Sequence, residues 1–231
     1  MMMRFPFLHK PSRRSRRSFS SFDCFEERCL LTGNVSAAVS NGSLNVTGDA
    51  QDNEIKIEYT GVVGQYKITG TGTTVNGSPF VTFNGVTGDF NVKMGNGNDA
   101  LLLFANGALH FPIHGDLNID SGSGDNVVIM QTDNTSQILI DGDVSVKAKG
   151  GGDNFLIKAN GAGSTVSIAG NLKTTLGPGS NSSLLQSFGN GSAVLIFGTT
   201  TYTGKNGNDI LLLQASGTTS RVEPVGDMFV K

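Results

Sequence analysis

Seven aspartates that recur at turns from residue 89 onward are the side chains best suited to chemistry in this sequence. Asp89, Asp116 and Asp143 each follow a glycine and are equally spaced along the chain. The others lie in Gly-rich turns and are Asp99, Asp125, Asp153 and Asp209. Calcium prefers several oxygen ligands, so stacked carboxylates are a candidate metal set. We prefer a structural interpretation, because Asn and Asp side chains in turns hydrogen-bond the backbone two residues on.

One of these turns, Gly95-x-Gly97-x-Asp99-x-Leu101, resembles the calcium-binding nonapeptide of RTX proteins. The resemblance implies a calcium-stabilised binding module, which is the second candidate function. RTX turns recur every nine residues, whereas here one such turn occurs in each much longer repeat, and the acid shifts between neighbouring positions. We therefore predict no cofactor, with calcium as the alternative. We expect an Asx ladder that stacks Asn98, Asp125, Asp153, Asn181 and Asp209.

The elements that must position these turns belong to that repeat. The phrases GDFNV, GDLNI, GDVSV, GNLKT, GTTTY and GDMFV begin at Gly88, Gly115, Gly142, Gly170, Gly198 and Gly226. The last three steps between these glycines are one residue longer than the first two. A nearly fixed period of this size indicates stacked structural units, none of which can bury its apolar face alone.

Each repeat contains three short apolar runs separated by Gly, Asn, Asp and Ser, which predicts three strands per coil. The first run stacks Phe90, Leu117, Val144, Leu172 and Thr200, then Val92, Ile119, Val146, Thr174 and Tyr202. The third run stacks Phe111, Ile138, Val166, Val194 and Val222, then Ile113, Ile140, Ile168 and Ile196. Recurrence in register favours parallel strands over hairpins. We therefore predict an all-β fold over residues 88–231, a single-stranded right-handed parallel β-helix.

The second run is apolar on both of its faces. We expect an inward column of Leu102, Ile129, Ile157, Leu185 and Leu213. Successive side chains of a strand alternate, so the neighbouring column would point outward as an interface of Leu101, Val128, Leu156, Leu184 and Leu212. Such a stripe, about 20 Å long, is suited to self-association or to docking a cell-envelope or matrix component.

Residues 32–87 are predicted to form an irregular N-terminal β region. The stretch of chain from Gly42 to Gly88 is clearly longer than one coil. The surplus is interpreted either as an expanded coil or as an added hairpin. Either arrangement would cap the open edge of the first coil, which otherwise invites pairing with another chain.

Residues 1–31 form a basic tail on an acidic body. The whole chain carries 17 basic and 19 acidic groups, of which seven basic and three acidic groups lie in the tail. The low apolar content of this Arg- and Ser-rich tail predicts disorder. It lacks the continuous apolar segment of an ordinary secretory signal, and the chain contains no apolar run long enough to span a membrane. The acidic body argues against nucleic-acid binding.

The tail ends in a short motif made of Phe25, Glu26, Glu27, Arg28, Cys29, Leu30 and Leu31. It resembles the LEPRxLL motif found near the N-terminus of planctomycete surface-associated proteins, with Phe25 in place of Leu and Glu27 in place of Pro. The resemblance implies export to the cell surface or the extracellular space, with a sorting or processing role for the tail. It implies no enzymatic activity.

Catalysis has little support in the sequence. Pectate lyases and polygalacturonases share the parallel β-helix, so a carbohydrate-active enzyme is the third candidate, although a fold does not establish a function. The body contains one arginine, Arg221, and neither His110 nor His114 lies in an acid-base motif. Cys24 and Cys29 lie in the tail and are interpreted as non-catalytic. We therefore expect no catalytic residues, and a structural or adhesive role.

Overall fold

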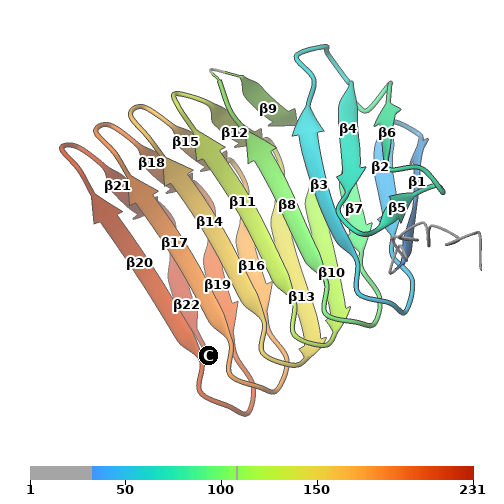
Figure 1. Cartoon of the computed structure of the whole chain (residues 1–231). Coiled ribbons are helices and arrows are strands. Elements are labelled where there is room, and N and C mark those ends of the chain that lie inside the picture. Colours follow the sequence, from blue (N-terminus) through green and yellow to red (C-terminus); the bar gives the residue numbers. More distant parts are fainter. Residues whose placement is uncertain (1–32, 108) are drawn as a thin grey trace, which may run out of the picture.

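Alternating inward apolar and outward polar residues, interrupted by Gly, Asn and Asp, produce three strands in each regular coil. The computed structural model describes residues 33–107 and 109–231. These residues contain strands and no helix, and successive coils stack as a parallel β-helix (Figure 1). No helix in this part of the chain could therefore cross a membrane.

The three faces of the solenoid are three sheets, each built from one strand per coil. The first sheet contains β2 (Ser43–Thr47), β7 (Phe90–Lys93), β10 (Leu117–Ser123), β13 (Val144–Gly150), β16 (Leu172–Thr175), β19 (Thr200–Thr203) and β22 (Met228–Val230). The second contains β3 (Glu54–Tyr59), β8 (Ala100–Ala105), β11 (Val127–Asp133), β14 (Asn154–Asn160), β17 (Ser182–Phe188) and β20 (Ile210–Ser216). The third contains β9 (His110–Ile113), β12 (Gln137–Ile140), β15 (Thr165–Ile168), β18 (Ala193–Ile196) and β21 (Arg221–Pro224).

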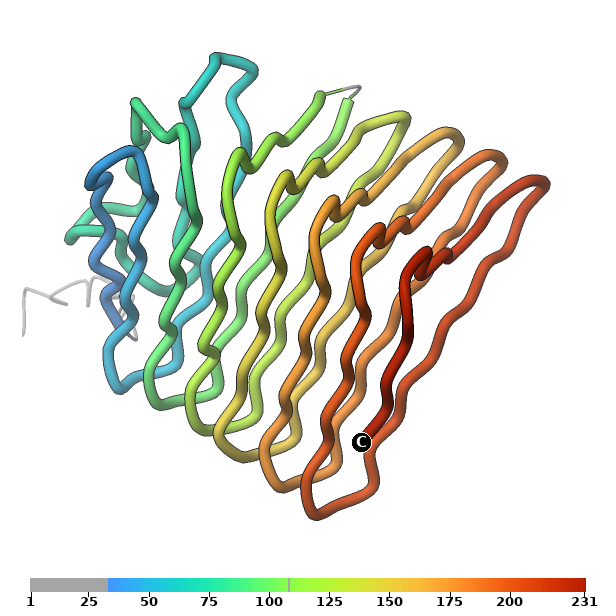
Figure 2. Tube along the Cα trace, turned by 180° about the vertical axis from the view of Figure 1, so that it is seen from behind, coloured from blue at the N-terminus to red at the C-terminus, as the bar shows by residue number. Residues whose placement is uncertain are grey.

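The register confirms the predicted columns of the first and third runs. Phe90 pairs with Leu117, which pairs with Val144 in the next coil, and all three side chains are buried. In the third sheet Ile138 pairs with both Phe111 and Val166, again with all three buried. Figure 2 shows from behind how the coils follow one another along the axis. The apolar interior between the three sheets is the core of the protein.

The N-terminal region begins as a coil and then adds antiparallel strands. β2 and β3 already pair in parallel with β7 and β8 of the next coil. β1 (Asn34–Ser40) runs antiparallel to β2, while β4 (Tyr66–Gly70) and β6 (Phe80–Phe83) extend the second sheet as an antiparallel meander beyond β3. The short β5 (Thr74–Val75) pairs with β1. Of the two interpretations of the surplus residues, the hairpin is therefore correct.

An aromatic cluster packs this meander against the first regular coil. The ring of Tyr66 meets Phe90 edge-on, with 4.9 Å between ring centroids, and lies 5.3 Å from Phe111. Its hydroxyl donates a hydrogen bond to the carbonyl oxygen of Pro112. Tyr66 is 1% exposed, and burial raises the pKa of its hydroxyl above the usual value. The cluster thus fastens the N-terminal cap to the core of the solenoid.

Gly122 shows why the turns between the first two sheets need glycine. Its φ of 81° is a conformation that L side chains rarely adopt. A Cβ at this position would lie 1.6 Å from the carbonyl oxygen of Gly95 in the preceding coil. The backbones of neighbouring coils therefore approach too closely here for any side chain.

Candidate interaction surface

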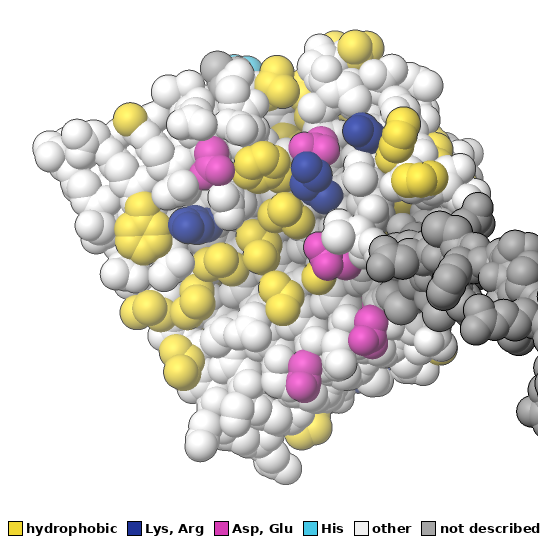
Figure 3. Space-filling view, in the orientation of Figure 1, with side chains coloured by type: hydrophobic (Ala, Val, Ile, Leu, Met, Phe, Trp, Pro, Cys, Tyr) yellow, Lys and Arg dark blue, Asp and Glu magenta, His cyan; other side chains and the backbone are white. Residues whose placement is uncertain are grey.

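The most distinctive surface feature is an outward apolar column on the second sheet, which we call the apolar stripe. It consists of Leu102, Ile129, Leu156, Leu184 and Leu212, which pair in register from β8 to β20. The first four are half-buried, and Leu212 is 41% exposed. At about 4.8 Å per strand the stripe is about 19 Å long. Figure 3 shows hydrophobic side chains gathered in an oblique band on this face.

The stripe differs in two residues from the interface that the sequence predicts. Leu101 and Val128 point inward and are only 1% and 3% exposed, so the prediction was wrong for them. Their places are taken by Leu102 and Ile129, which were expected in the core. The inward columns are instead Leu101, Val128, Phe155, Ser183 and Leu211, followed by Leu103, Met130, Ile157, Leu185 and Leu213.

The error arises from the position of the extra residue in the longer coils. β12 begins after the three-residue turn 134–136, whereas β15 begins after the four-residue turn 161–164. The extra residue thus lies after β14. The number of residues from a position on β11 to its partner on β14 is therefore the same as from β8 to β11. Ile129 therefore pairs with Leu156 and not with Ile157. Because alternate side chains of a strand point to opposite faces, a shift of one residue reverses the facing. The strand bounds locate this change in turn length, which the spacing of the repeats by itself does not.

Aromatic side chains and lysines border the stripe. The Nζ atom of Lys56 lies 5.8 Å from the ring centroid of Phe104, and Lys158 lies at the same distance from Phe188. The aliphatic stems of these lysines cover apolar surface. The charged end of Lys56 forms an ion pair with Glu58, with 2.9 Å between Nζ and Oε1. At the far end, Ile210 on β20 is 58% exposed beside Leu212.

The other end of the stripe is hollowed. A cavity of about 390 Å³ opens between β4, β3, β8 and β11. Its lining includes Ala100, Leu102 and Ile129, together with Lys56 and Glu54. The second sheet thus presents an apolar hollow at one end and exposed apolar side chains at the other.

The turn aspartates do not belong to the apolar stripe. Their side chains form hydrogen bonds with the backbone of neighbouring coils. The Oδ1 atom of Asp99 accepts a hydrogen bond from the backbone N–H of Asn53 at 2.8 Å. The N–H of Asp99 in turn donates to Asn126, and the series continues in the same way from coil to coil. This inner ladder consists of Asn53, Asp99, Asn126, Asp153, Asn181 and Asp209.

An Asx ladder is therefore present, but the predicted membership was wrong at two positions. Asn98 and Asp125 belong to an outer ladder, in which the N–H of Asn98 donates to Asp52 and the N–H of Asp125 donates to Asn98. The N–H of Gly152 then donates to Asp125 at 2.7 Å. Inner and outer positions are adjacent in the sequence, so periodicity alone does not separate them.

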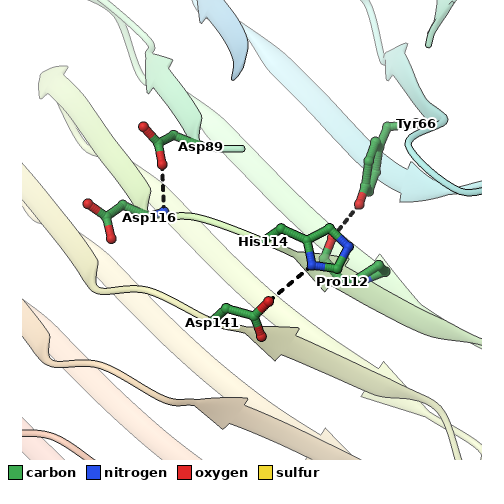
Figure 4. A network of polar contacts seen from close by, with 6 residues as sticks. All are labelled: Tyr66, Asp89, Pro112, His114, Asp116 and Asp141. Atoms are coloured by element: carbon green, nitrogen blue, oxygen red, sulfur yellow. Dashed lines mark hydrogen bonds and ion pairs between the residues drawn. The ribbon is translucent and has the colours of Figure 1, made fainter. Parts of the chain in front are cut away.

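The opposite corner carries a third ladder, partly drawn in Figure 4. The N–H of Asp116 donates to Asp89 at 2.9 Å, and the N–H of Asp143 donates to Asp116 at 2.8 Å. Asn171 and Thr199 continue the series. One oxygen of each carboxylate is thus committed to the backbone of the next coil, which offsets the repulsion between stacked charges.

The seven candidate metal ligands are not brought together in one place. They are distributed among the three ladders, and residues 33–107 and 109–231 contain no cluster of three or more His, Cys, Asp or Glu arranged to hold a metal ion. Asp99 and Asp153 are the two that are buried. Burial raises the pKa of Asp99 to about 6 and also raises the pKa of Asp153.

Both histidines of the body are exposed and bonded along the third face. His110 Nδ1 lies 3.0 Å from the amide oxygen of Gln137, and His114 Nδ1 lies 3.0 Å from Oδ2 of Asp141 (Figure 4). Each partner comes from the next coil, so these contacts are further links between neighbouring coils. His114 stands two residues before Asp116, and its hydrogen-bond partner is Asp141, which is not one of the seven turn aspartates.

The predicted sorting motif, Phe25 to Leu31, lies outside the described residues, as does the rest of the predicted tail. No protein-family model matches the chain, and the comparisons with curated proteins and with solved structures gave no match.

Proposed function

We propose that this chain is an exported structural or adhesive protein of the cell surface that acts without catalysis. The observation that supports this function most directly is the apolar stripe, which is continuous across five parallel strands. A soluble sheet face that carries no contact normally alternates apolar inward residues with polar outward ones. Here the outward position is apolar in every coil from β8 to β20, which is suited to a contact surface.

The rigidity of the scaffold also supports an adhesive role. The sheets and the Asx ladders connect successive coils, so the stripe is held on regular strands and not on loops. A preorganised surface loses little conformational entropy when it binds. The resemblance of residues 25–31 to the LEPRxLL motif supports delivery of this surface to the outside of the cell.

The proposal is tested by fractionating cells that express the full chain and by measuring binding of the purified protein to isolated cell envelopes. We expect the protein in the envelope or extracellular fraction, and we expect envelope binding that is weakened by Leu156→Ser with Leu184→Ser. The matched control, Lys173→Ser with Thr201→Ser on the first sheet, should bind like the wild type. Confinement to the cytoplasm, or cleavage of a polysaccharide in a parallel screen, would refute the proposed function.

A further inference from the structure

We propose that the outer face of the first sheet binds an acidic polysaccharide, in a groove formed by β7, β10 and β13. The ligand is a chain of hydroxyl-bearing sugars that also carries anionic groups. This site lies on a different sheet from the apolar stripe, so the inference goes beyond the proposed function and does not depend on it. Three properties of the groove support it: its shape, its unpaired positive charge, and its free polar atoms.

The groove is an open cavity of about 270 Å³ between two rows of outward side chains. These rows pair in register from β7 to β13, so the groove runs along the solenoid axis and crosses the strands. An open groove admits one section of an extended polymer, whereas an enclosed pocket would admit only a small molecule. The polar lining consists of Asn91, Asn118 and Ser145 on one side and Lys93, Asp120 and Lys147 on the other.

One wall of the groove carries positive charge that the protein does not neutralise. Asp120 pairs in register with Lys93 on one side and with Lys147 on the other. Its carboxylate is engaged elsewhere, because Oδ2 lies 3.3 Å from Nζ of Lys149 and Oδ1 accepts a hydrogen bond from the N–H of Gly122. Lys93 and Lys147 are exposed and form no ion pair with any described residue. The groove therefore holds two unpaired cations on strands about 10 Å apart.

These two lysines lie apart from the acidic corner of the same sheet. Asp116 and Asp143 come just before β10 and β13, whereas Asp120 and Lys147 lie roughly 13 Å further along these strands, at about 3.3 Å per residue. That separation exceeds the Debye length of about 8 Å at physiological ionic strength. The corner carboxylates therefore do not cancel the attraction of the lysines for an anion.

The opposite wall offers hydrogen-bonding atoms to sugar hydroxyls. Nδ2 of Asn118 donates to Oδ1 of Asn91 at 3.2 Å, and Nδ2 of Asn91 donates in the same way to Asn45. This row of amides orients Asn118 and ends there, because the next strand holds Ser145 at the paired position. Oδ1 of Asn118 and Oγ of Ser145 have no hydrogen-bond partner in the described part of the chain. An oriented acceptor and a hydroxyl beside two cations suit an anionic sugar better than a bare anion.

A nucleic acid fits this groove less well. None of the described residues that line the groove is aromatic, so an unpaired base would find no ring on which to stack. The chain beyond residue 31 also carries more acidic than basic groups, which disfavours a polymer with a charge on every unit. We therefore commit to a polysaccharide and include a nucleic acid in the test.

The first test compares the full chain with its Lys93→Ser, Lys147→Ser double variant in titration calorimetry against alginate, a polysaccharide of carboxylated sugars. We expect the double variant to bind alginate about tenfold more weakly than the wild type. Because both proteins keep the basic residues 1–31, binding through that segment contributes equally to the two measurements. Poly-glutamate and polyuridylate should show a clearly smaller loss, and uncharged dextran should not bind. Equal alginate affinity in the two proteins, or an equal loss for poly-glutamate or polyuridylate, would overturn the proposal.

The second test separates sugar recognition from charge. Asn118→Ala removes the oriented acceptor without changing any charge, and should weaken alginate binding while leaving poly-glutamate binding unchanged. The matched control for the lysines is Lys205→Ser with Lys231→Ser, which removes the same charge from exposed positions outside the groove and should bind alginate like the wild type. Loss of alginate binding in this control, or unchanged binding in Asn118→Ala, would overturn the proposal.

The groove and the apolar stripe can be tested independently. Leu156→Ser with Leu184→Ser changes only the second sheet, so this variant should bind alginate like the wild type even where its envelope binding is weakened. Failure of the polysaccharide proposal and failure of the proposed function can therefore be told apart.

Discussion

The backbone N–H of Asn53 donates to Oδ1 of Asp99 at 2.8 Å, while Oδ2 of the same carboxylate is buried without a partner among the described residues. Asp153 repeats this arrangement two coils later, since its Oδ2 is also buried and unpartnered in the described part of the chain. One oxygen of each carboxylate thus accepts a hydrogen bond from the neighbouring coil, and the other oxygen is buried away from solvent. The ladder that joins the coils therefore contains groups whose ionisation opposes folding.

The first prediction is that stability decreases as the pH rises through about 6. Burial raises the pKa of Asp99 from 3.8 to about 6, with a further upward contribution from Asp52 and Asp49. Since the folded-state pKa lies above the unfolded one, the stabilising contribution is complete below pH 3.8 and is lost as the pH rises through about 6. The loss should be on the order of 2 kcal/mol. Chemical denaturation at pH 4.5 and pH 8 measures it.

Asp99→Asn provides the matched variant for the pH prediction. At the equivalent position of the next coil, the Nδ2 atom of Asn126 donates to the carbonyl oxygen of Gly124 at 3.0 Å, so an amide fits this ladder. We expect Asp99→Asn to raise the melting temperature at pH 8 and to have little effect at pH 4.5. Equal effects at both pH values would show that ionisation of Asp99 does not limit stability.

The second prediction separates the two faces of the second sheet. Ile157 is fully buried and Ile129 is half-buried on the outer face. Ile157→Asp should destabilise the fold by more than about 4 kcal/mol, because it places an unpaired charge in the dry core. Ile129→Asp should still fold cooperatively and should weaken binding to isolated cell envelopes. Circular dichroism melting together with the envelope-binding assay distinguishes the two variants, and unfolding of both would contradict the observed register.

The third prediction concerns the close approach of coils at Gly122. Gly122→Ala and Gly85→Ala both place alanine at positive φ, 81° and 75°, but only at Gly122 does the Cβ meet another backbone. Gly85→Ala should cost about 1 kcal/mol from the dihedral alone. Gly122→Ala should cost clearly more, since the Gly95 carbonyl must move. Urea denaturation compares the two, and equal costs would show that the coils separate easily at this turn.

The fourth prediction is that calcium does not stabilise the fold. Asp89, Asp116 and Asp125 each commit one oxygen to a backbone N–H of the next coil. A ligand that binds only the folded state must raise its melting temperature. We therefore expect equal melting temperatures in millimolar calcium and in chelator. A shift of several degrees with calcium would favour the calcium-stabilised module instead.

The fifth prediction concerns export. If the motif at Phe25 to Leu31 directs processing, the mature protein should begin at or beyond this segment. Mass spectrometry of protein recovered from the envelope fraction measures its N-terminus. Recovery of the chain starting at Met1 would contradict processing, without bearing on the apolar stripe.

The sequence by itself determined the architecture, because the repeat is carried by local chemistry. Apolar residues two apart set the strands, Gly and Asx residues set the turns, and the nearly constant step between repeats sets the stacking, as Phe90, Leu117 and Val144 show. These signals require no knowledge of distant contacts. The predicted turn ladders follow from the same local rules, although their membership does not.

Only the tertiary structure decided which face of the second sheet is buried. Leu101 and Leu102 are both apolar, so composition cannot assign either to the core, and a register error of one residue exchanges them. The pairing of Ile129 with Leu156 determines the assignment, because the register of the hydrogen bonds between β11 and β14 decides which side chains share a face. The arrangement of the surplus residues before Gly88 is likewise determined by packing, because the ring of Tyr66 contacts those of Phe90 and Phe111.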